Sequence, residues 1–220
     1  MKKRKIKYKK LITFILIIII ISFSIYKLFN TNINTIYILN NKYLTKDEIL
    51  NILNINENSK LIKTILIENK LSKSDYIIEG KIYHKNIFDL YIKLEENIPL
   101  YYNNNTKETI LLDGKKVNKK YSVPTLITSI PEKQNIRFNK EMKKVNIDIL
   151  NKISEISYKP SEKDENLFLL SMTDGNYVYL TLDRFDNINT YLDIMNKLEH
   201  KIKGQKGILY LDSGNYFDIL

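Results

Sequence analysis

The residue types that carry out most enzymatic chemistry are scarce in this chain. It contains no cysteine, which excludes disulfides, thiolate nucleophiles and cysteine-bound zinc. Its two histidines, His84 and His200, are 116 positions apart, which is more typical of solvated surface residues than of a metal site. The motifs of serine hydrolases, P-loop proteins and HExxH metalloproteases are missing, and six glycines leave little for a phosphate-binding loop.

Two carboxylate pairs are the remaining candidates for acid–base chemistry. Asp47-Glu48 lies at an expected helix start, where acids suit the helix dipole, and Glu95-Glu96 is expected at the edge of a strand. Both pairs are interpreted as solvated. We therefore expect a protein that is not an enzyme, holds no metal and no cofactor, and acts by binding.

Residues 11–29 are expected to form a transmembrane helix that anchors everything after it. The stretch has no Asp, Glu or Arg, and Lys27 is its only charge. Nineteen residues make roughly 28 Å of helix, about the thickness of a bilayer core. A cleaved signal peptide is the alternative, with Ser22-Phe23-Ser24 as a weak cleavage site, but the long apolar run without alanine favours an uncleaved anchor.

The distribution of charge predicts the topology of this anchor. Residues 1–10 carry seven positive charges and no negative one, so the positive-inside rule leaves them in the cytoplasm and puts residues 30–220 outside the cell membrane. Eight of the 35 basic residues and none of the 25 acidic ones lie in residues 1–29. The outer part is therefore nearly neutral, and nucleic acid is not an expected partner.

A small α+β unit is expected first outside the membrane, over residues 30–99. Its order is strand, helix, helix, strand, strand, with expected bounds 35–39, 46–53, 59–71, 76–83 and 88–95. Two helices on one face of a three-stranded sheet would bury a modest core, and Pro99 ends the unit.

The first helix has the strongest local signal in the outer part. Thr45 and Glu48 form a capping box, and Leu44 and Ile49 are placed as its hydrophobic staple. Ser59 is expected to cap the second helix. The apolar face of that helix would consist of Leu61, Ile62, Ile65, Leu66 and Leu71.

A mixed, β-rich domain with two helices is expected over residues 100–220. Its helices are expected to begin at Asn139, running to Ile156, and at Asn187, whose stripe ends at Ile202. Its strands are expected over 110–112, 125–127, 167–172, 177–182, 208–211 and 215–219, and the hairpin turn over 173–176. The last strand is expected at a sheet edge, where unpaired backbone groups can accept a partner.

Taken in order, these elements resemble the FtsQ/DivIB family of bitopic bacterial division proteins. The resemblance rests on three stretches: Leu44–Ile49, like the family's L-T-x-E-x-I in its polypeptide-transport-associated (POTRA) unit; Leu94–Pro99 with Leu112–Val117, like V-x-E-R-x-P and L-D-x-x-G-x-V; and the strand–turn–strand ending Leu211–Phe217. Asn97 stands where an Arg is usual, and Ile87 where a Pro is usual.

The resemblance implies a fold, a role and a docking site. It implies a POTRA unit followed by a β domain, enrichment at the division septum, and binding of FtsB/DivIC-like and FtsL-like partners. The resulting trimer would act on the septal peptidoglycan synthase pair FtsW and its penicillin-binding protein. The partner-binding residues that it implies are Leu211, Ser213, Gly214, Asn215, Tyr216 and Phe217.

Other functions fit the same layout. One is a membrane-anchored export, secretion or envelope-assembly component that uses the POTRA unit for docking, and another is an envelope-stress or sporulation protein. A membrane-anchored enzyme fits least well. A fluorescent fusion would separate these alternatives, because a mid-cell band favours division and a uniform rim favours the others.

Overall fold

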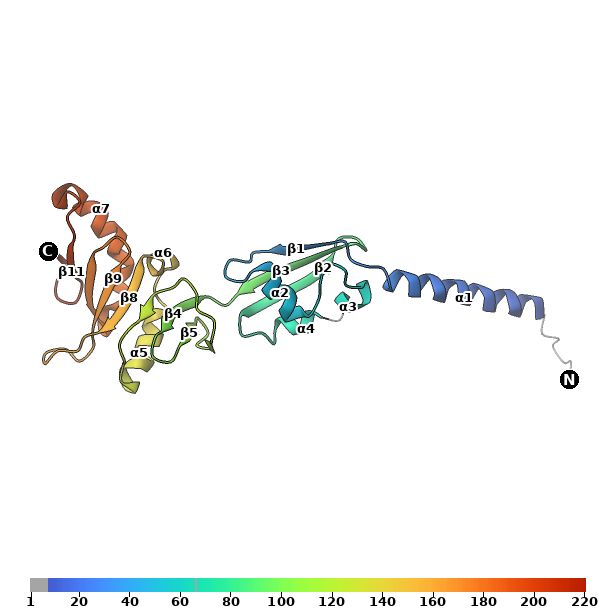
Figure 1. Cartoon of the computed structure of the whole chain (residues 1–220), viewed down its shortest axis with the longest axis horizontal. Coiled ribbons are helices and arrows are strands. Elements are labelled where there is room, and N and C mark those ends of the chain that lie inside the picture. Colours follow the sequence, from blue (N-terminus) through green and yellow to red (C-terminus); the bar gives the residue numbers. More distant parts are fainter. Residues whose placement is uncertain (1–7, 66) are drawn as a thin grey trace, which may run out of the picture. The chain divides into compact units, whose positions relative to one another are not determined.

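The computed structural model describes residues 8–65 and 67–220, which fold as two compact units that meet between Glu96 and Asn97 (Figure 1). Residues 1–7 of the expected cytoplasmic tail lie outside the described residues, as does Leu66, which the sequence put on the apolar face of the second helix. Each unit is considered by itself.

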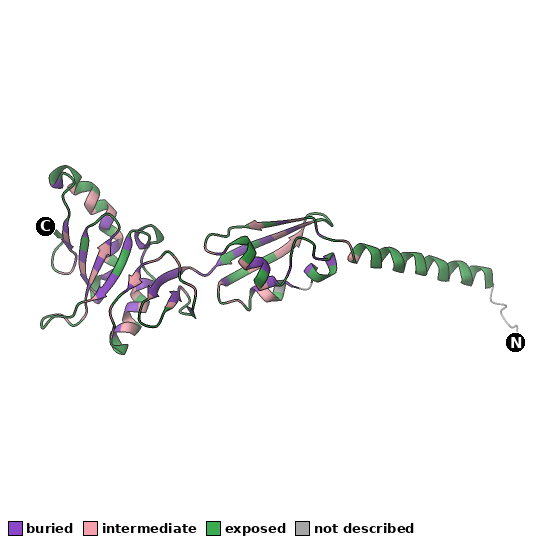
Figure 2. Cartoon of the chain, in the orientation of Figure 1, coloured by how far each residue is buried: buried purple, intermediate pink, exposed green. Residues whose placement is uncertain are grey.

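Helix α1 (Tyr8–Phe29) contains the whole expected span. It is the only helix in the described part of the chain that is long and apolar enough to cross a membrane. Its apolar side chains are exposed along its length (Figure 2), as expected of a helix whose partner is lipid. The helix is compatible with the predicted anchor.

The rest of the first unit is a three-stranded sheet with helices on one face. In chain order the elements are β1 (Thr35–Leu39), α2 (Lys46–Leu53), α3 (Leu61–Ile65), α4 (Glu68–Leu71), β2 (Ile77–His84) and β3 (Asp89–Glu96). The strands lie in the order β1-β3-β2, with β1 parallel and β2 antiparallel to β3. The alternation of β3 predicted that Leu90, Ile92 and Leu94 face one core, and all three are buried there against Ile49 and Leu53 of α2.

The capping box at the start of α2 is confirmed in both directions. The Thr45 hydroxyl accepts from the Glu48 backbone N–H, and the Glu48 carboxylate accepts from the Thr45 backbone N–H at 2.9 Å. Leu44 and Ile49 share the buried core, as the predicted staple requires.

Glu96 does not lie at a solvated strand edge, so that prediction was wrong. It ends the central strand β3 and is 92% buried, and its carboxylate accepts the backbone N–H groups of Lys42, Tyr43 and Leu44 at 2.6, 2.7 and 2.8 Å. These three bonds fix the loop that leads into the capping box. The error arose because the partners are more than fifty positions away in the chain.

The second predicted helix is broken into two short pieces, α3 and α4. Ser59 does not cap it, because its hydroxyl accepts from the backbone N–H of Asn56 in the preceding turn. Ile62 and Ile65 point to solvent and not into the core. The sequence predicted that Tyr76, Ile78 and Ile82 share the inward face of β2, and Tyr76 and Ile82 do pack against the core. The prediction for Ile78 was wrong, because an irregularity between Ile77 and Glu79 turns Ile77 inward and leaves Ile78 exposed.

The second unit is built on one nine-stranded sheet. Its strands are β4 (Pro99–Asn103), β5 (Glu108–Leu111), β6 (Lys116–Val117), β7 (Thr125–Leu126), β8 (Ile153–Tyr158), β9 (Leu167–Met172), β10 (Tyr177–Thr181), β11 (Gly207–Tyr210) and β12 (Tyr216–Ile219). Their order is β12-β11-β10-β9-β8-β7-β4-β5-β6. The helical segments are α5 (Glu132–Met142), α6 (Ile147–Leu150), the 3-10 segment η1 (Leu182–Thr190) and α7 (Tyr191–Ile202).

Aromatic rings form the centre of this unit. Phe138 of α5 stacks on Phe168 of β9 at 5.0 Å, and Phe185 of η1 packs edge-on against both rings. Tyr101 of β4 adds a further edge contact to Phe138, and its hydroxyl donates to Asn139 Oδ1 at 2.6 Å. The sheet and its helices thus share one core.

The two predicted helices of this unit differ from the structure. Asn139 lies inside α5 and does not begin a helix, and the segment that was expected to be helical to Ile156 contains α6 and then strand β8. Asn187 lies inside η1, and α7 begins only at Tyr191. The apolar residues do recur at three- and four-residue spacing in the sequence. Ile153 and Ile156 nevertheless belong to strand β8, which pairs with β9.

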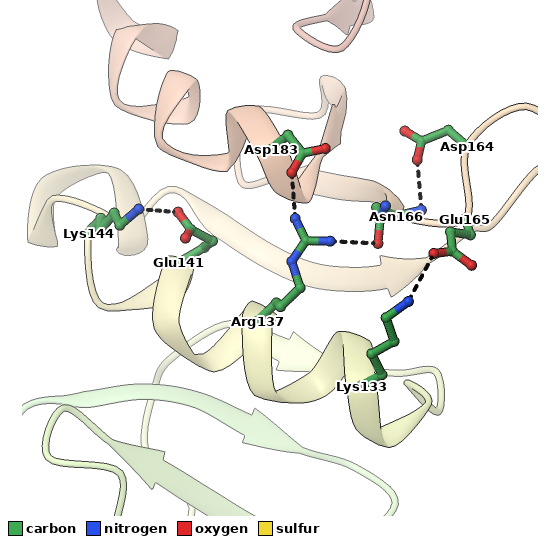
Figure 3. A network of polar contacts seen from close by, with 8 residues as sticks. All are labelled: Lys133, Arg137, Glu141, Lys144, Asp164, Glu165, Asn166 and Asp183. Atoms are coloured by element: carbon green, nitrogen blue, oxygen red, sulfur yellow. Dashed lines mark hydrogen bonds and ion pairs between the residues drawn. The ribbon is translucent and has the colours of Figure 1, made fainter.

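A polar network holds α5 against the loop before β9 and the start of η1 (Figure 3). Arg137 donates to Asn166 Oδ1 at 3.3 Å and pairs with Asp183, and Lys133 lies 3.7 Å from Glu165. These side chains are largely exposed, so each ion pair contributes little to stability. We interpret the network as structural.

Candidate functional site

The candidate site is the edge of the large sheet formed by β12. This strand is last in the sheet order and pairs only with β11 among the described strands, antiparallel, with Tyr210 opposite Tyr216 and Gly207 opposite Ile219. An edge strand has one row of backbone N–H and C=O groups that no strand of its own sheet satisfies. β12 is therefore a place where the sheet can be extended by another chain; the opposite edge, β6, is only two residues long.

The pairing shows which backbone groups face outward. The Leu220 N–H donates to the Lys206 carbonyl at 3.0 Å, so Leu220 faces β11. Because successive residues of a strand direct their backbone groups to opposite sides, Tyr216 and Asp218 also face β11. The N–H and C=O groups of Phe217 and Ile219 consequently point to the free edge.

Three tyrosines form a row across the last strands on the face of the sheet away from the core. Tyr179 of β10 stacks on Tyr210 of β11 at 5.5 Å, and Tyr210 stacks on Tyr216 of β12 at 4.5 Å. Tyr216 is half exposed. The other side of β12 packs inward through Phe217, which lies against the core. The strand β12 therefore has an inward face at Phe217 and an outward face at Tyr216.

Gly207 allows β12 to lie this close to β11. A Cβ atom at position 207 would lie 2.1 Å from the Asp218 carbonyl oxygen and 2.6 Å from the Phe217 ring. Since backbone cannot yield as a flexible side chain can, any larger residue must move β12. The position of the edge strand therefore depends on this glycine.

A cluster of polar side chains, in which Asn176 and Tyr191 are buried, fixes the start of β11. Asn176, in the turn between β9 and β10, accepts from the Gly207 N–H through Oδ1 at 3.0 Å and donates to the Tyr191 hydroxyl at 3.2 Å. The Tyr191 hydroxyl donates to Asp174 Oδ2 at 2.7 Å. Burial, followed by the bond to Asp174, raises the pKa of Tyr191 well above its usual value, so the hydroxyl stays protonated.

The six residues assigned to the partner site by resemblance take three different positions. Leu211 is fully buried in the core of the second unit. Ser213, Gly214 and Asn215 form the turn before β12, with Gly214 and Asn215 at φ of +149° and +55°. Tyr216 and Phe217 lie in the strand itself, facing solvent and core respectively.

Several residues that shape this edge were not identified from the sequence. They include the stacking partners Tyr179 and Tyr210, the exposed Ile219, and Gly207 beneath the strand. The two-residue spacing of Tyr177 and Tyr179 was a usable signal for an outward row, since strand side chains alternate. The role of Gly207 depends on the packing of β12 and has no sequence signal.

The surroundings of His84 differ from those expected from the sequence. Among the residues that the structure describes, no three His, Cys, Asp or Glu side chains are grouped to hold a metal ion. The prediction that His84 is solvated was wrong, because its Nδ1 is buried and its Nε2 contacts Thr64 Oγ1 at 3.1 Å. The Thr64 hydroxyl donates to the Leu61 carbonyl, so His84 Nε2 carries the proton and donates to Thr64.

Comparisons with known proteins point to cell division. The cell division protein DivIB of Bacillus subtilis is 25% identical over 222 residues, covering 96% of this chain and 83% of that protein. DivIB of Geobacillus kaustophilus is 23% identical over 188 residues, covering 80% of this chain and 71% of that protein. No family model matches the chain.

The major extracytoplasmic domain of DivIB from Geobacillus stearothermophilus is among the solved structures that align with this chain. It covers 48% of this chain and 97% of that one, at 21% identity and a TM-score of 0.38, which is too loose a superposition to carry an argument. The similarity to these relatives supports the assignment of this chain to the DivIB/FtsQ family. Their shared name supports a role in cell division.

Proposed function

We propose that this chain is a single-span, non-enzymatic scaffold of the division machinery whose β12 edge docks a partner division protein. The first unit would be its POTRA unit. The partner would be an FtsB/DivIC-like protein, itself bound to an FtsL-like one, and the assembly would support septal peptidoglycan synthesis. Helix α1 would hold the protein in the cell membrane, with residues 30–220 outside it, and the protein would be enriched at the septum.

The observation that carries this proposal is the position of β12 at the sheet edge together with the groups that it exposes. The strand is short, ends the sheet, and offers the backbone groups of Phe217 and Ile219 to an added strand. Beside this free edge lie the half-exposed Tyr216, Ile219 at 45% exposure and Leu220 at 73%. Backbone pairing would supply binding energy, and these apolar side chains would supply anchors.

A proline at position 219 tests the edge without removing any side chain from the core. The Ile219 N–H faces the free edge, so Ile219→Pro removes an outward donor and adds a ring that blocks an incoming strand, while the bonds to β11 remain. We expect affinity for the outer segment of the FtsB/DivIC-like partner to fall by at least about fivefold, since a lost backbone bond alone is worth about 1 kcal/mol, and by more because the ring also blocks the incoming strand.

Ile219→Thr is the matched control, because it shortens the same exposed side chain and keeps the N–H. It should retain most of the binding. If Ile219→Pro binds as tightly as Ile219→Thr, the partner does not pair with β12.

The division role itself is tested in cells. A fluorescent fusion of the full chain should form a mid-cell band in dividing cells. A uniform membrane rim would instead favour a role in export or envelope assembly.

A further inference from the structure

One end of the first unit exposes an apolar surface that its fold does not use. Its members are Ile62 and Ile65 on α3 and Ile87 and Phe88 in the turn between β2 and β3, each between 40 and 48% exposed. We call these four side chains the apolar rim. They come from two segments that are about twenty positions apart in the sequence.

Hydrogen bonds bring the two segments together. His84, at the end of β2, donates to Thr64 of α3 through Nε2. The same segments both bind the residues that follow α1. The Leu61 N–H donates to the Thr31 carbonyl at 2.9 Å, and the Asn34 N–H donates to the Phe88 carbonyl at 2.9 Å.

The rim is therefore held close to the end of the proposed span. Asn32 forms an isolated bridge with Lys60, only three residues after α1 ends at Phe29. Three residues reach about 10 Å at full extension. The headgroup region of a bilayer is roughly 5 to 8 Å thick on each side, so α3 and the β2–β3 turn lie within reach of it.

The charge of this end also suits a lipid surface. Residues 30–35, 59–65 and 84–89 carry three lysines, Lys60, Lys63 and Lys85, and one acidic residue, Asp89, whose carboxylate accepts from Asn86 Nδ2 at 2.6 Å; the outer part as a whole is nearly neutral. Lys85 lies over the Tyr91 ring at 4.4 Å, and Lys60 contacts Asn30. Lysines beside apolar side chains are the composition of surfaces that bind anionic headgroups.

We propose that the apolar rim inserts into the headgroup region of the membrane that holds the protein's own span, with the three lysines against anionic lipid. This inference rests on the membrane anchor of the proposed function. Lipid is favoured over a protein partner because the rim is tied by backbone hydrogen bonds to the residues that leave the span. The contact would fix how the first unit stands on the membrane.

The absence of tryptophan from the chain makes a direct test possible. Single-tryptophan versions of the full-length protein are inserted into vesicles of zwitterionic and anionic phospholipid whose acyl chains carry bromine atoms both near the headgroup end, for the rim, and near the terminal methyl, for the middle of the span. Phe88→Trp and Ile65→Trp report on the rim. Ile18→Trp reports on the span, and Ile136→Trp, at an exposed position on α5, reports on solvent.

We expect the fluorescence emission of Phe88→Trp and Ile65→Trp to be blue-shifted. The fraction of their fluorescence that bromine quenches should be comparable with the fraction quenched in Ile18→Trp. Ile136→Trp should remain unquenched. Adding Ile62→Asp to Phe88→Trp should restore much of its emission, while Ile62→Thr, which is uncharged, should restore less. Two rim positions are used so that a local disturbance at either one is detected.

The outcomes separate the rim from the anchor. If Ile18→Trp is quenched and both rim positions emit like Ile136→Trp, the chain spans the membrane and the rim proposal is overturned. If Ile18→Trp is not quenched either, the anchor is refuted and the rim proposal falls with it.

Discussion

Replacing Glu96 by glutamine should destabilise the first unit strongly. The carboxylate accepts three backbone N–H groups from residues 42–44. The amide oxygen of glutamine can serve two of them, but the amide nitrogen then faces the third donor. One buried N–H left without an acceptor costs about 1–3 kcal/mol of unfolding free energy. The two remaining hydrogen bonds, whose acceptor is now neutral, each become weaker by roughly 0.5–1 kcal/mol.

The expected loss is therefore roughly 2–5 kcal/mol in the free energy of unfolding of this unit. For a domain of its size each kcal/mol lowers the melting temperature by about 4–8 °C. Thermal unfolding of the full-length protein in detergent measures the change in melting temperature. Amide hydrogen exchange over residues 42–53 then measures the change in the first unit separately from the second one. Faster exchange is expected through the loop and α2, because the three bonds hold the loop that begins the helix.

The neighbouring residue provides a matched control. Glu95 is exposed on the opposite face of β3, so Glu95→Gln should change stability by less than about 0.5 kcal/mol. If Glu96→Gln and Glu95→Gln melt together, the three hydrogen bonds do not stabilise the unit and the reasoning fails.

Three further predictions concern a cap, a glycine and a histidine. Thr45→Ala should cost the first unit roughly 1 kcal/mol, measured by the same amide exchange, and no change would mean that the capping box contributes nothing. Gly207→Ala should displace β12 through the clash with the Asp218 carbonyl, so the amides of β12 should exchange faster while those of β9 stay protected. Burial lowers the pKa of His84, so the unfolded chain takes up the proton first and the first unit should lose stability as the pH falls below about 6.5. His84→Gln should flatten this pH dependence, His200→Gln on the exposed face of α7 should not, and equal profiles for the two variants would contradict the assignment.

Local signals in the sequence predicted local structure well. The capping box of Thr45 and Glu48, the alternation of Leu90, Ile92 and Leu94, and the turn at Gly175 each depend on residues a few positions apart. Such short-range signals act in the same way whatever the distant parts of the chain do. These elements were found with their bounds close to the observed ones.

Features that depend on distant residues were missed or misassigned. Ile153 and Ile156 fit a helical stripe, but pairing with β9 makes them part of a strand. Glu96 was taken as solvated because the loop that it binds is far away in sequence, and Ile78 was turned outward by an irregularity in the pairing of β2 with β3. At the candidate site, the turn and strand of residues 213–219 were predictable, whereas the tyrosine row and the role of Gly207 arise only from pairing across the sheet.

The most direct measurement of the central claim is amide hydrogen exchange in β12 with and without the FtsB/DivIC-like partner, resolved residue by residue. The Phe217 and Ile219 N–H groups face the free edge, whereas those of Tyr216 and Asp218 face β11. If a partner strand extends the sheet, exchange at Phe217 and Ile219 should slow strongly on binding and exchange at Tyr216 and Asp218 should change little. Binding of the partner with unchanged exchange at Phe217 and Ile219 would contradict strand addition at this edge.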